Sequence, residues 1–498
     1  MYKVMKNLSV LTKLEGTLLI SKSTFPFFML VALEAGSPLR ALVLLLVSPL
    51  FWFLESIYLE NASVRLMIFI SLVGLKISDV KAVAKAVLPR FFLEDIQENT
   101  YKVFSSCEGK KYVSSSLPRV MIEPFLREYL SSDFVIGTEL KTLSGFSLGL
   151  VASPGLMTGA SQYETISKIL GDDKKIGLWL GNERETESSM FFCQDQYVVT
   201  ADSATCLQRK DYPKPLIFHD GRLVARPTPL DSLAVSLWLP LGILLAVFRL
   251  MIGRIMPYNY GLMVAATTGM KIRAKLPSEE SHICKKHVPY SRCTRESCDP
   301  GQLGALNTLY VCSHRTLIDP VIVSSTLKRS VMAVTYSISK ISEILAPIRT
   351  VRLSRDRVKD GEMMRTLLRK SELVVCPEGT TCREPYLLRF SPLFSEIAES
   401  IVPVAVSAKG SMFYGTTVRG YKWLDSFFFL MNPIPHYHLQ FLEKISGVPS
   451  CGNSGRSSYE IANHVQKMIG QALGFECTNL TRREKYRILA GNDGVCSE

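Results

Sequence analysis

A histidine and an aspartate stand close together just after an apolar run with the pattern of a buried strand. His314 follows the run Leu309–Cys312, and Asp319 comes five positions later. Because proline suits the first turn of a helix, we expect Asp319 to cap a helix over Pro320–Leu327 and its carboxylate to reach the imidazole. Such a pair fixes the tautomer and raises the basicity of the ring, as a general base for a hydroxyl requires. The spacing alone is not specific, since such residues are more often ordinary loop residues.

A second strand and turn, further along the chain, repeats this arrangement. The apolar run Leu373–Cys376 leads into a turn rich in proline and glycine that carries Glu378 and Arg383, and Arg355 and Arg357 lie between the two blocks. Guanidinium groups match the oxygens of phosphate, so these arginines are candidates for binding an anionic substrate. Without further context, an arginine in a loop is usually only solvated.

Taken in order, these blocks resemble the glycerolipid acyltransferases, and they are most similar to the land-plant glycerol-3-phosphate acyltransferases of the cutin and suberin type. The resemblance runs nearly from end to end. It rests on His314 with Asp319, Arg355-Asp356-Arg357, Pro377-Glu378-Gly379-Thr380 with Arg383, and Val402-Pro403. One departure is Ser313, where the plant proteins more usually carry asparagine.

The resemblance implies a membrane-bound enzyme that moves a long-chain acyl group from acyl-coenzyme A to a hydroxyl of glycerol 3-phosphate. It implies acylation of the middle (sn-2) hydroxyl, for glycerolipid or for extracellular cutin and suberin synthesis. Acyl-coenzyme A is then a co-substrate, and we expect no bound cofactor and no metal. Two alternatives stay open: a lysophospholipid as the acceptor, and a catalytically silent membrane scaffold.

Each candidate residue receives an expected role in this reaction. We expect His314, oriented by Asp319, to deprotonate the acceptor hydroxyl, which attacks the thioester directly, because no activated serine or cysteine points to a covalent acyl-enzyme. Backbone amides near the start of the Pro320 helix are expected to stabilise the oxyanion. Glu378 either holds an acceptor hydroxyl or braces its turn. Arg355, Arg357 and Arg383 are expected to bind the phosphate of the acceptor, and Gly379 and Thr380 are the remaining expected substrate-binding residues.

The amino-terminal region resembles the haloacid-dehalogenase phosphatases but lacks their chemistry. The first motif of that family carries two aspartates before Gly-Thr, and this chain has Lys13 and Glu15 in their places. A lysine cannot form the aspartyl-phosphate, and it puts a positive charge where Mg²⁺ should sit. Thr138 is interpreted as the retained hydroxyl of the second motif, and Gly181–Ser189 as a degenerate acidic motif. We therefore expect no phosphatase activity and a product that keeps its phosphate.

Composition points to a membrane. The chain has 498 residues, 47% of them hydrophobic, and a formal net charge of +13. Such a charge suits nucleic acid, anionic lipid or anionic substrates, and the absence of an interleaved aromatic and basic motif favours lipid headgroups, phosphate or coenzyme A over nucleic acid. We expect an integral membrane protein of the endoplasmic reticulum with its catalytic domain in the cytosol.

The apolar runs differ in length. Leu233–Ile252 is long enough to span a bilayer, with Pro240 predicted to kink it or to turn it into a re-entrant hairpin. Ala41–Leu54 and Leu66–Leu75 are too short to span, so they are core helices or a hairpin in one leaflet. The basic residues expected to hold the long helix at an anionic leaflet are Arg249, Arg254, Lys271, Arg273 and Lys275.

These segments predict an α/β protein with three parts: a haloacid-dehalogenase-like domain over residues 1–225, membrane segments and a polar linker over 226–300, and an acyltransferase domain over 301–498. In the last part, the expected strands are Leu309–Cys312, Ser330–Thr335, Thr350–Leu353, Leu373–Cys376 and Ile401–Val406, and the expected helices are Pro320–Leu327, Asp360–Lys370 and Ser391–Ala398. The twelve cysteines form no dense framework, so reduced thiols are expected. A histidine and cysteine group between His282 and Cys298 fits no usual zinc spacing and is interpreted as a solvated loop.

Overall fold

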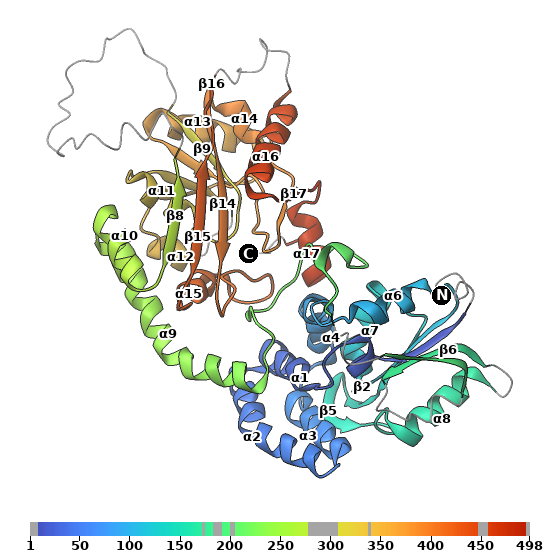
Figure 1. Ribbon diagram of the computed structural model, residues 1–498. Helices are drawn as coiled ribbons and strands as arrows, with labels where there is room; N and C mark the ends of the chain where they lie inside the picture. Colours follow the sequence, from blue (N-terminus) through green and yellow to red (C-terminus); the bar gives the residue numbers. More distant parts are fainter. Residues whose placement is uncertain are drawn as a thin grey trace, which may run out of the picture. The chain divides into compact units, whose positions relative to one another are not determined.

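The computed structural model describes residues 8–171, 175–182, 192–199, 205–276, 307–336, 340–446 and 457–494. The chain forms two compact units, one from Met1–Gly221 with Ala225–Leu237 and the other from Arg222–Val224 with Trp238–Glu498. Both units combine a mainly parallel sheet with helices (Figure 1), which confirms the predicted α/β class.

The first unit is built on a parallel sheet of five strands in the order β3-β2-β1-β6-β7. These strands are β1 (Val10–Lys13), β2 (Lys111–Pro118), β3 (Phe134–Thr138), β6 (Ile176–Asn182) and β7 (Cys193–Val199). The helix α8 (Gly159–Leu170) packs Ile166 and Leu170 against side chains of the sheet such as Leu11 and Ile136. Because β1 is central, its carboxyl end at Lys13 lies in the middle of the sheet edge where α/β proteins bind ligands.

Most other elements of this unit are helical. They are α1 (Phe25–Val31), α2 (Pro38–Ser56), α3 (Glu60–Leu72), α4 (Ile77–Ala86), α5 (Leu88–Leu93), α6 (Glu98–Ser106) and α7 (Arg119–Glu128), with a small hairpin of β4 (Leu140–Leu143) and β5 (Phe146–Val151). The sequence predicted an apolar run, Ala41–Leu54, that is shorter than a membrane span. The helix α2 that contains it has 19 residues, which is enough in length and composition to cross a membrane. Several apolar side chains of α2 are exposed, Leu46 and Trp52 among them.

The second unit contains a larger sheet in the order β11-β10-β12-β9-β14-β15-β8, with β16 paired to β14. Its strands are β8 (Lys271–Lys275), β9 (Leu309–Cys312), β10 (Met332–Thr335), β11 (Thr350–Arg352), β12 (Leu373–Val375), β14 (Ser400–Lys409), β15 (His436–Phe441) and β16 (Ile445–Ser446). Its helices are α10 (Tyr258–Thr267), α11 (Asp319–Leu327), α12 (Lys340–Leu345), α13 (Arg357–Lys370), α14 (Leu393–Ile397), α15 (Asp425–Leu430), α16 (Ser458–Leu473) and α17 (Arg482–Ala490). The short strands β13 (Tyr386–Leu387) and β17 (Glu476–Cys477) pair with each other.

The side chains of β9 point alternately to the two faces of this sheet. Leu309 and Val311 are fully buried in a cluster with side chains of α13, α14 and α16. Successive side chains of a strand point to opposite faces, so Tyr310 and Cys312 face the other side. The five strands predicted after residue 300 are all present, with ends shifted by a few residues.

Three strands of this sheet, β8, β15 and β16, were not predicted. The edge strand β8 pairs in parallel with β15, so that Lys271 lies opposite His436 and Arg273 opposite His438. The basic residues of β8, which were expected to hold the long helix at an anionic leaflet, are part of the sheet. Exposed charged side chains on an edge strand also discourage pairing with another chain.

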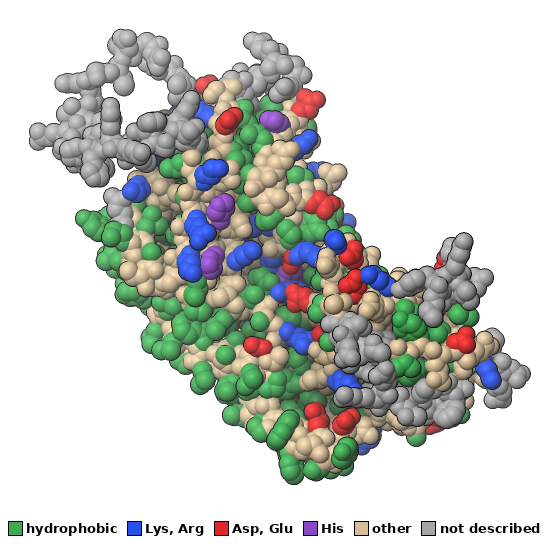
Figure 2. All heavy atoms as spheres, viewed as in Figure 1, with side chains coloured by type: hydrophobic (Ala, Val, Ile, Leu, Met, Phe, Trp, Pro, Cys, Tyr) green, Lys and Arg blue, Asp and Glu red, His purple; other side chains and the backbone are tan. Residues whose placement is uncertain are grey.

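The long apolar helix α9 (Pro229–Ile255) has 27 residues and is longer than the predicted Leu233–Ile252. It continues through Pro240 as one bent helix (Figure 1), so the alternative of a re-entrant hairpin is wrong. Its length and composition also suit a membrane span. Exposed apolar side chains gather over it (Figure 2), including Leu237, Leu244 and Met251.

The one charged residue in the middle of the predicted span does not face outward. The guanidinium of Arg249 is buried and donates to the backbone carbonyls of Leu430, Asn432 and Pro433 and to Thr268. The expectation that Arg249 contacts an anionic leaflet is therefore wrong, because its hydrogen bonds tie α9 to the loop between α15 and β15.

Candidate active site

The turn between β9 and α11 positions the histidine and the aspartate. His314 Nδ1 lies 3.1 Å from Asp319 Oδ2, within hydrogen-bond distance. Asp319 is the first residue of α11 rather than its N-cap, which is Ile318. Its Oδ2 instead accepts hydrogen bonds from the backbone amides of Arg315 at 2.5 Å and Thr316 at 2.9 Å, which folds the turn around the carboxylate.

The other carboxylate oxygen has partners of its own. Asp319 is fully buried, and its Oδ1 accepts from the hydroxyl of Thr316 at 2.8 Å and from that of Tyr437 at 3.0 Å. The two hydroxyls also contact each other. Tyr437 comes from β15, more than 100 residues away, and sequence reasoning did not find it, since a buried tyrosine in an apolar stretch usually belongs to the core.

These contacts set the protonation of His314. Burial lowers the pKa of His314, while contact with Cys376 and the carboxylate of Asp319 raise it, and the balance lies above the ordinary value of 6.5. With Nδ1–H donating to Asp319, Nε2 is the ring nitrogen that can accept a proton from a substrate hydroxyl. The side chain is 15% exposed, so a small substrate has access to it.

Glu378 supports this histidine through the backbone. Its Oε1 accepts from the amide of His314 at 2.8 Å, and its Oε2 accepts from the amide of Leu388 at 2.9 Å. Of the two roles expected from sequence, these bonds favour bracing over holding an acceptor hydroxyl. The next residue, Gly379, has φ of +65°, a conformation that favours glycine.

Arg315, between the two members of the pair, clamps the same turn. Its guanidinium donates to the backbone carbonyls of Cys382 at 2.6 Å, Glu384 at 2.8 Å and Tyr386 at 3.1 Å. The side chain is buried and stacks 4.4 Å from the ring centroid of Phe475. Arg315 therefore fixes the Glu378 turn against the His314 turn. Its place inside the first block was the only sequence signal for this role.

Two thiols lie beside the imidazole. The sulfurs of Cys312 and Cys376 are 3.3 Å apart. Cys312 is the last residue of β9, and Cys376 directly follows the adjacent strand β12. Contact with Cys312 and burial raise the pKa of Cys376 well above the ordinary 9.0. Cys376 is therefore a neutral thiol at physiological pH, and a poor nucleophile, which agrees with the expected direct transfer.

Several backbone amides near the start of α11 are used by the turn itself. The amides of Arg315 and Thr316 donate to Asp319, the amide of Asp319 donates to the carbonyl of Thr316, and Pro320 has no N–H. Oxyanion stabilisation by other amides near the start of this helix stays a prediction.

His314 opens into an inner pocket of about 120 Å³. Thr380 and Gly379 of the second block line it, as do three cations that were not predicted, Lys422, Arg482 and Lys485. Lys422 belongs to a short 3₁₀ helix (Lys422–Leu424) and the other two to α17. Basic residues far from any motif give no sequence signal that separates them from solvated surface charges.

The predicted arginines lie elsewhere. Arg355 and Arg357 line an outer pocket of about 400 Å³ together with Arg389 and Arg482, and His314 does not line it. The inner and outer pockets share Arg482, Gly379 and Tyr336.

Arg383 lines neither of these pockets. It stacks 4.3 Å from the ring centroid of Tyr414 and donates to Thr416. The structure therefore does not bring Arg383 together with the other two predicted arginines.

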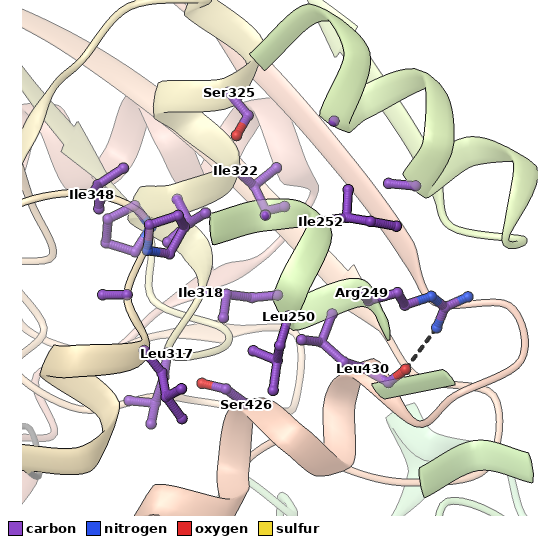
Figure 3. A pocket seen from close by; sticks show the side chains of 18 of the residues that line it. Arg249, Leu250, Ile252, Leu317, Ile318, Ile322, Ser325, Ile348, Ser426 and Leu430 are labelled. Atoms are coloured by element: carbon purple, nitrogen blue, oxygen red, sulfur yellow. Dashed lines mark hydrogen bonds between the residues drawn. The ribbon is translucent and has the colours of Figure 1, made fainter. Parts of the chain in front are cut away.

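A third, apolar pocket of about 180 Å³ adjoins the inner one. Figure 3 shows Leu250 and Ile252 of α9 on one side of it, and Leu317, Ile318 and Ile322, from the His314 turn and α11, on the other. Leu317, Pro320 and Thr335 line both this pocket and the inner one. The inner pocket, into which His314 opens, therefore adjoins an apolar space.

In the first unit, two of the degenerate positions, Glu15 and Thr138, form hydrogen bonds with residues of β2. Glu15 is buried, and its Oε1 accepts from the hydroxyls of Ser115 at 2.5 Å and Ser116 at 3.2 Å, both on β2. Thr138 instead donates to the carbonyl of Ser116 at 2.7 Å and accepts from the amide of Met157 at 3.2 Å. The hydroxyls beside position 15 thus come from β2, and Thr138 does not supply them.

Lys13 is the last residue of the central strand β1, two positions before Glu15. Within the described residues, no three His, Cys, Asp or Glu side chains come together as a metal site. The acidic stretch from Glu183 to Ser189, the side chain of Asn182 and the histidine and cysteine group between His282 and Cys298 lie outside the described residues.

Comparison with known proteins decides the family. Residues 9–199 match the family model described as glycerol-3-phosphate acyltransferase RAM2-like, HAD-like domain, and residues 299–407 match the acyltransferase family model. Glycerol-3-phosphate acyltransferase RAM2 of Petunia hybrida is 44% identical over 97% of this chain and 97% of its own length. The chain belongs to the plant glycerol-3-phosphate acyltransferase family. The family predicted from the four blocks is thereby confirmed.

Two further comparisons can be reported. Glycerol-3-phosphate acyltransferase 1 of Arabidopsis thaliana is 45% identical over 97% of this chain and 81% of its own length. A solved structure titled 1-acyl-sn-glycerophosphate (LPA) acyltransferase, PlsC, from Thermotoga maritima is 15% identical, covers 49% of this chain and 95% of its own, and has a TM-score of 0.27. The acyltransferase family model matches this chain over residues 299–407 only. Four residues named above therefore lie beyond the matched region: Lys422, Tyr437, Arg482 and Lys485.

Proposed function

We propose that this chain transfers a long-chain acyl group from acyl-coenzyme A to a hydroxyl of glycerol 3-phosphate, at the sn-2 position. The observation that carries the proposal is the pairing of His314 with Asp319 beside a cationic inner pocket that His314 lines and that adjoins an apolar pocket. The substrates need these same features, since an acyl chain is apolar and both the acceptor and coenzyme A carry phosphate. The names of the relatives support the acceptor.

The reaction needs one proton carrier. Nε2 of neutral His314 takes the proton from the acceptor hydroxyl as its oxygen attacks the thioester carbonyl. The carboxylate of Asp319 stabilises the imidazolium that forms, and collapse of the tetrahedral intermediate breaks the carbon–sulfur bond. His314 then returns the proton to the departing thiolate, which leaves coenzyme A as a thiol and the ester as product.

The apolar pocket is the proposed site of the acyl chain. Its α9 wall carries exposed apolar side chains, which support placing this helix in a bilayer. Acyl chains then pass from lipid to His314 while coenzyme A stays in water. We place the enzyme in the endoplasmic reticulum, with residues 301–498 as the catalytic domain facing the cytosol.

The haloacid-dehalogenase-like domain, which we place over residues 1–225, has no catalytic role in this proposal. Lys13 in place of the aspartate nucleophile supports a product that keeps its phosphate, lysophosphatidic acid. The resemblance to the cutin and suberin type supports a role in glycerolipid or extracellular polyester synthesis.

The test uses full-length protein in membranes, with glycerol 3-phosphate, lysophosphatidic acid and a panel of acyl-coenzyme A donors. Wild type should acylate glycerol 3-phosphate at sn-2, and His314→Ala should lose roughly 10²–10⁴-fold in kcat, as expected for loss of a general base. Preference for lysophosphatidic acid as the acceptor would refute the proposed substrate. Turnover by His314→Ala at the wild-type rate would refute the mechanism.

A further inference from the structure

The inner pocket presents three cations to the space that His314 opens into. Lys485 is buried, and its ammonium donates to the carbonyl of Thr381 at 2.5 Å and to the hydroxyl of Thr380 at 3.2 Å. These bonds hold the charge beside the turn that follows Glu378. The cation therefore has a fixed position in the wall of the pocket.

Lys422 and Arg482 are gathered around one aromatic ring. The ammonium of Lys422 lies 5.0 Å and the guanidinium of Arg482 4.8 Å from the ring centroid of Tyr486, and the Tyr486 hydroxyl accepts from Lys422 at 2.5 Å. The two positive charges near this ring repel each other. An anion bound between them would be attracted by both and would offset this repulsion.

The one carboxylate that lines this pocket has another cation beside it. Asp425 forms an ion pair with Arg222 at 2.8 Å and accepts from the amide of Thr417. Burial raises the pKa of Asp425 to about 6, although Arg222 lowers it. The charge of the inner pocket is therefore positive near neutral pH, as an anionic ligand requires.

The covalent structure of the acceptor decides which anion enters this pocket. Its reacting hydroxyl must come within roughly 3 Å of His314 Nε2. Only a few bonds, each advancing about 1.5 Å or less, separate that hydroxyl from the phosphate. The phosphate must then lie in the same pocket as His314, and Arg355 and Arg357 line the outer pocket instead.

We propose that Lys422, Arg482 and Lys485 bind the phosphate of the acceptor in the inner pocket. This site rests on the proposed function and names the residues that select a phosphorylated acceptor. The phosphates of coenzyme A, which a long flexible arm separates from the thioester, then fall to Arg355, Arg357 and Arg389 of the outer pocket. The acceptor site is thus supplied by segments beyond the matched acyltransferase region, and the sequence-based assignment of the acceptor phosphate to Arg355, Arg357 and Arg383 is replaced.

Lys422→Gln tests the site, because Lys422 is less buried than Lys485 and its loss should leave the fold intact. We measure kcat and KM for glycerol 3-phosphate and for acyl-coenzyme A with the full chain in membranes, and inhibition by inorganic phosphate. The variant should raise KM for glycerol 3-phosphate about tenfold or more, weaken phosphate inhibition by a similar factor and leave KM for acyl-coenzyme A within about twofold. Lys422→Arg should restore most of the affinity.

Lys444→Gln is the matched control, since Lys444 is exposed after β15, lines none of the three pockets and loses the same charge. An unchanged KM for glycerol 3-phosphate in Lys422→Gln would overturn the site, as would a rise in KM for acyl-coenzyme A alone. Failure of the proposed function gives a different result, because wild type itself would then not acylate glycerol 3-phosphate.

Discussion

Replacing Asp319 with asparagine isolates the charge of the carboxylate from its geometry. Three N–H groups point at Oδ2, those of His314, Arg315 and Thr316, whereas Oδ1 faces the hydroxyls of Thr316 and Tyr437. An asparagine therefore keeps its oxygen toward the three N–H donors and turns its NH₂ toward the hydroxyls, which can rotate to accept. The tautomer of His314 should be preserved, with Nδ1 protonated and Nε2 free.

The expected loss of activity follows from this orientation. The hydrogen bond from His314 changes from charge-assisted to neutral, which costs about 1–2 kcal/mol in the transition state, where the imidazolium forms. That cost corresponds to a fall of roughly 5- to 30-fold in kcat. An aspartate-to-asparagine change that inverts the tautomer costs far more, about 10⁴-fold in the serine protease triad.

The pH profile gives an independent readout. Rates fall with decreasing pH as the base becomes protonated, and because the pKa of His314 is raised, the acid limb of kcat/KM in wild type should lie above pH 6.5. Asp319→Asn removes one of the groups that raise it, so the limb should move to lower pH.

The assay follows coenzyme A thiol release from pH 5 to 9, with thermal inactivation as the control for folding. A loss as large as that of His314→Ala in a folded Asp319→Asn protein would refute the preserved tautomer. A limb that does not move would refute the link between the carboxylate and the basicity of His314.

Three further outcomes are expected. Glu378→Gln should destabilise the protein by about 1–3 kcal/mol, because the NH₂ of the new amide would face a backbone N–H. KM for glycerol 3-phosphate should be nearly unchanged. A rise in that KM without loss of thermal stability would contradict the bracing role. Leu250→Phe should narrow the apolar pocket and shift the ratio of kcat/KM between shorter and longer acyl-coenzyme A donors roughly tenfold toward the shorter ones. Leu250→Ala should shift this ratio in the opposite direction. If both variants show the same donor preference as wild type, this pocket is not the acyl site. The protein should release no inorganic phosphate from lysophosphatidic acid in the presence of Mg²⁺, because Lys13 replaces the nucleophile. Mg²⁺-dependent phosphate release would show that the first unit is an active phosphatase.

The strands and the His314 turn were predictable because their information is local. An apolar run ending at Cys312 and a proline at position 320 bound the turn, so the meeting of His314 and Asp319 needed no distant contact. The helix α2 was underestimated because only its apolar middle was counted and the flanking residues were left out.

What could not be predicted depends on contacts distant in sequence. Tyr437 reaches Asp319 only because β15 lies beside β14, and Lys485 reaches Thr381 only because α17 folds back onto the second block. Arg383 is the opposite case, a residue that the sequence predicted to bind substrate because it lies in a recognisable block. In the structure it stacks on Tyr414 and lines neither the inner nor the outer pocket. Spacing identifies which residues a turn brings together, but not which charges a later segment adds.

The bonds of Arg249 bear on how this enzyme can be prepared. An apolar helix is often deleted to obtain a protein that needs no detergent, on the assumption that it serves only as an anchor. Here that deletion would strip the donor from the carbonyls of Leu430, Asn432 and Pro433 and remove one wall of the apolar pocket. A trimmed protein that fails to turn over would then say nothing about catalysis, and detergent micelles or nanodiscs holding the intact helix are the right starting material.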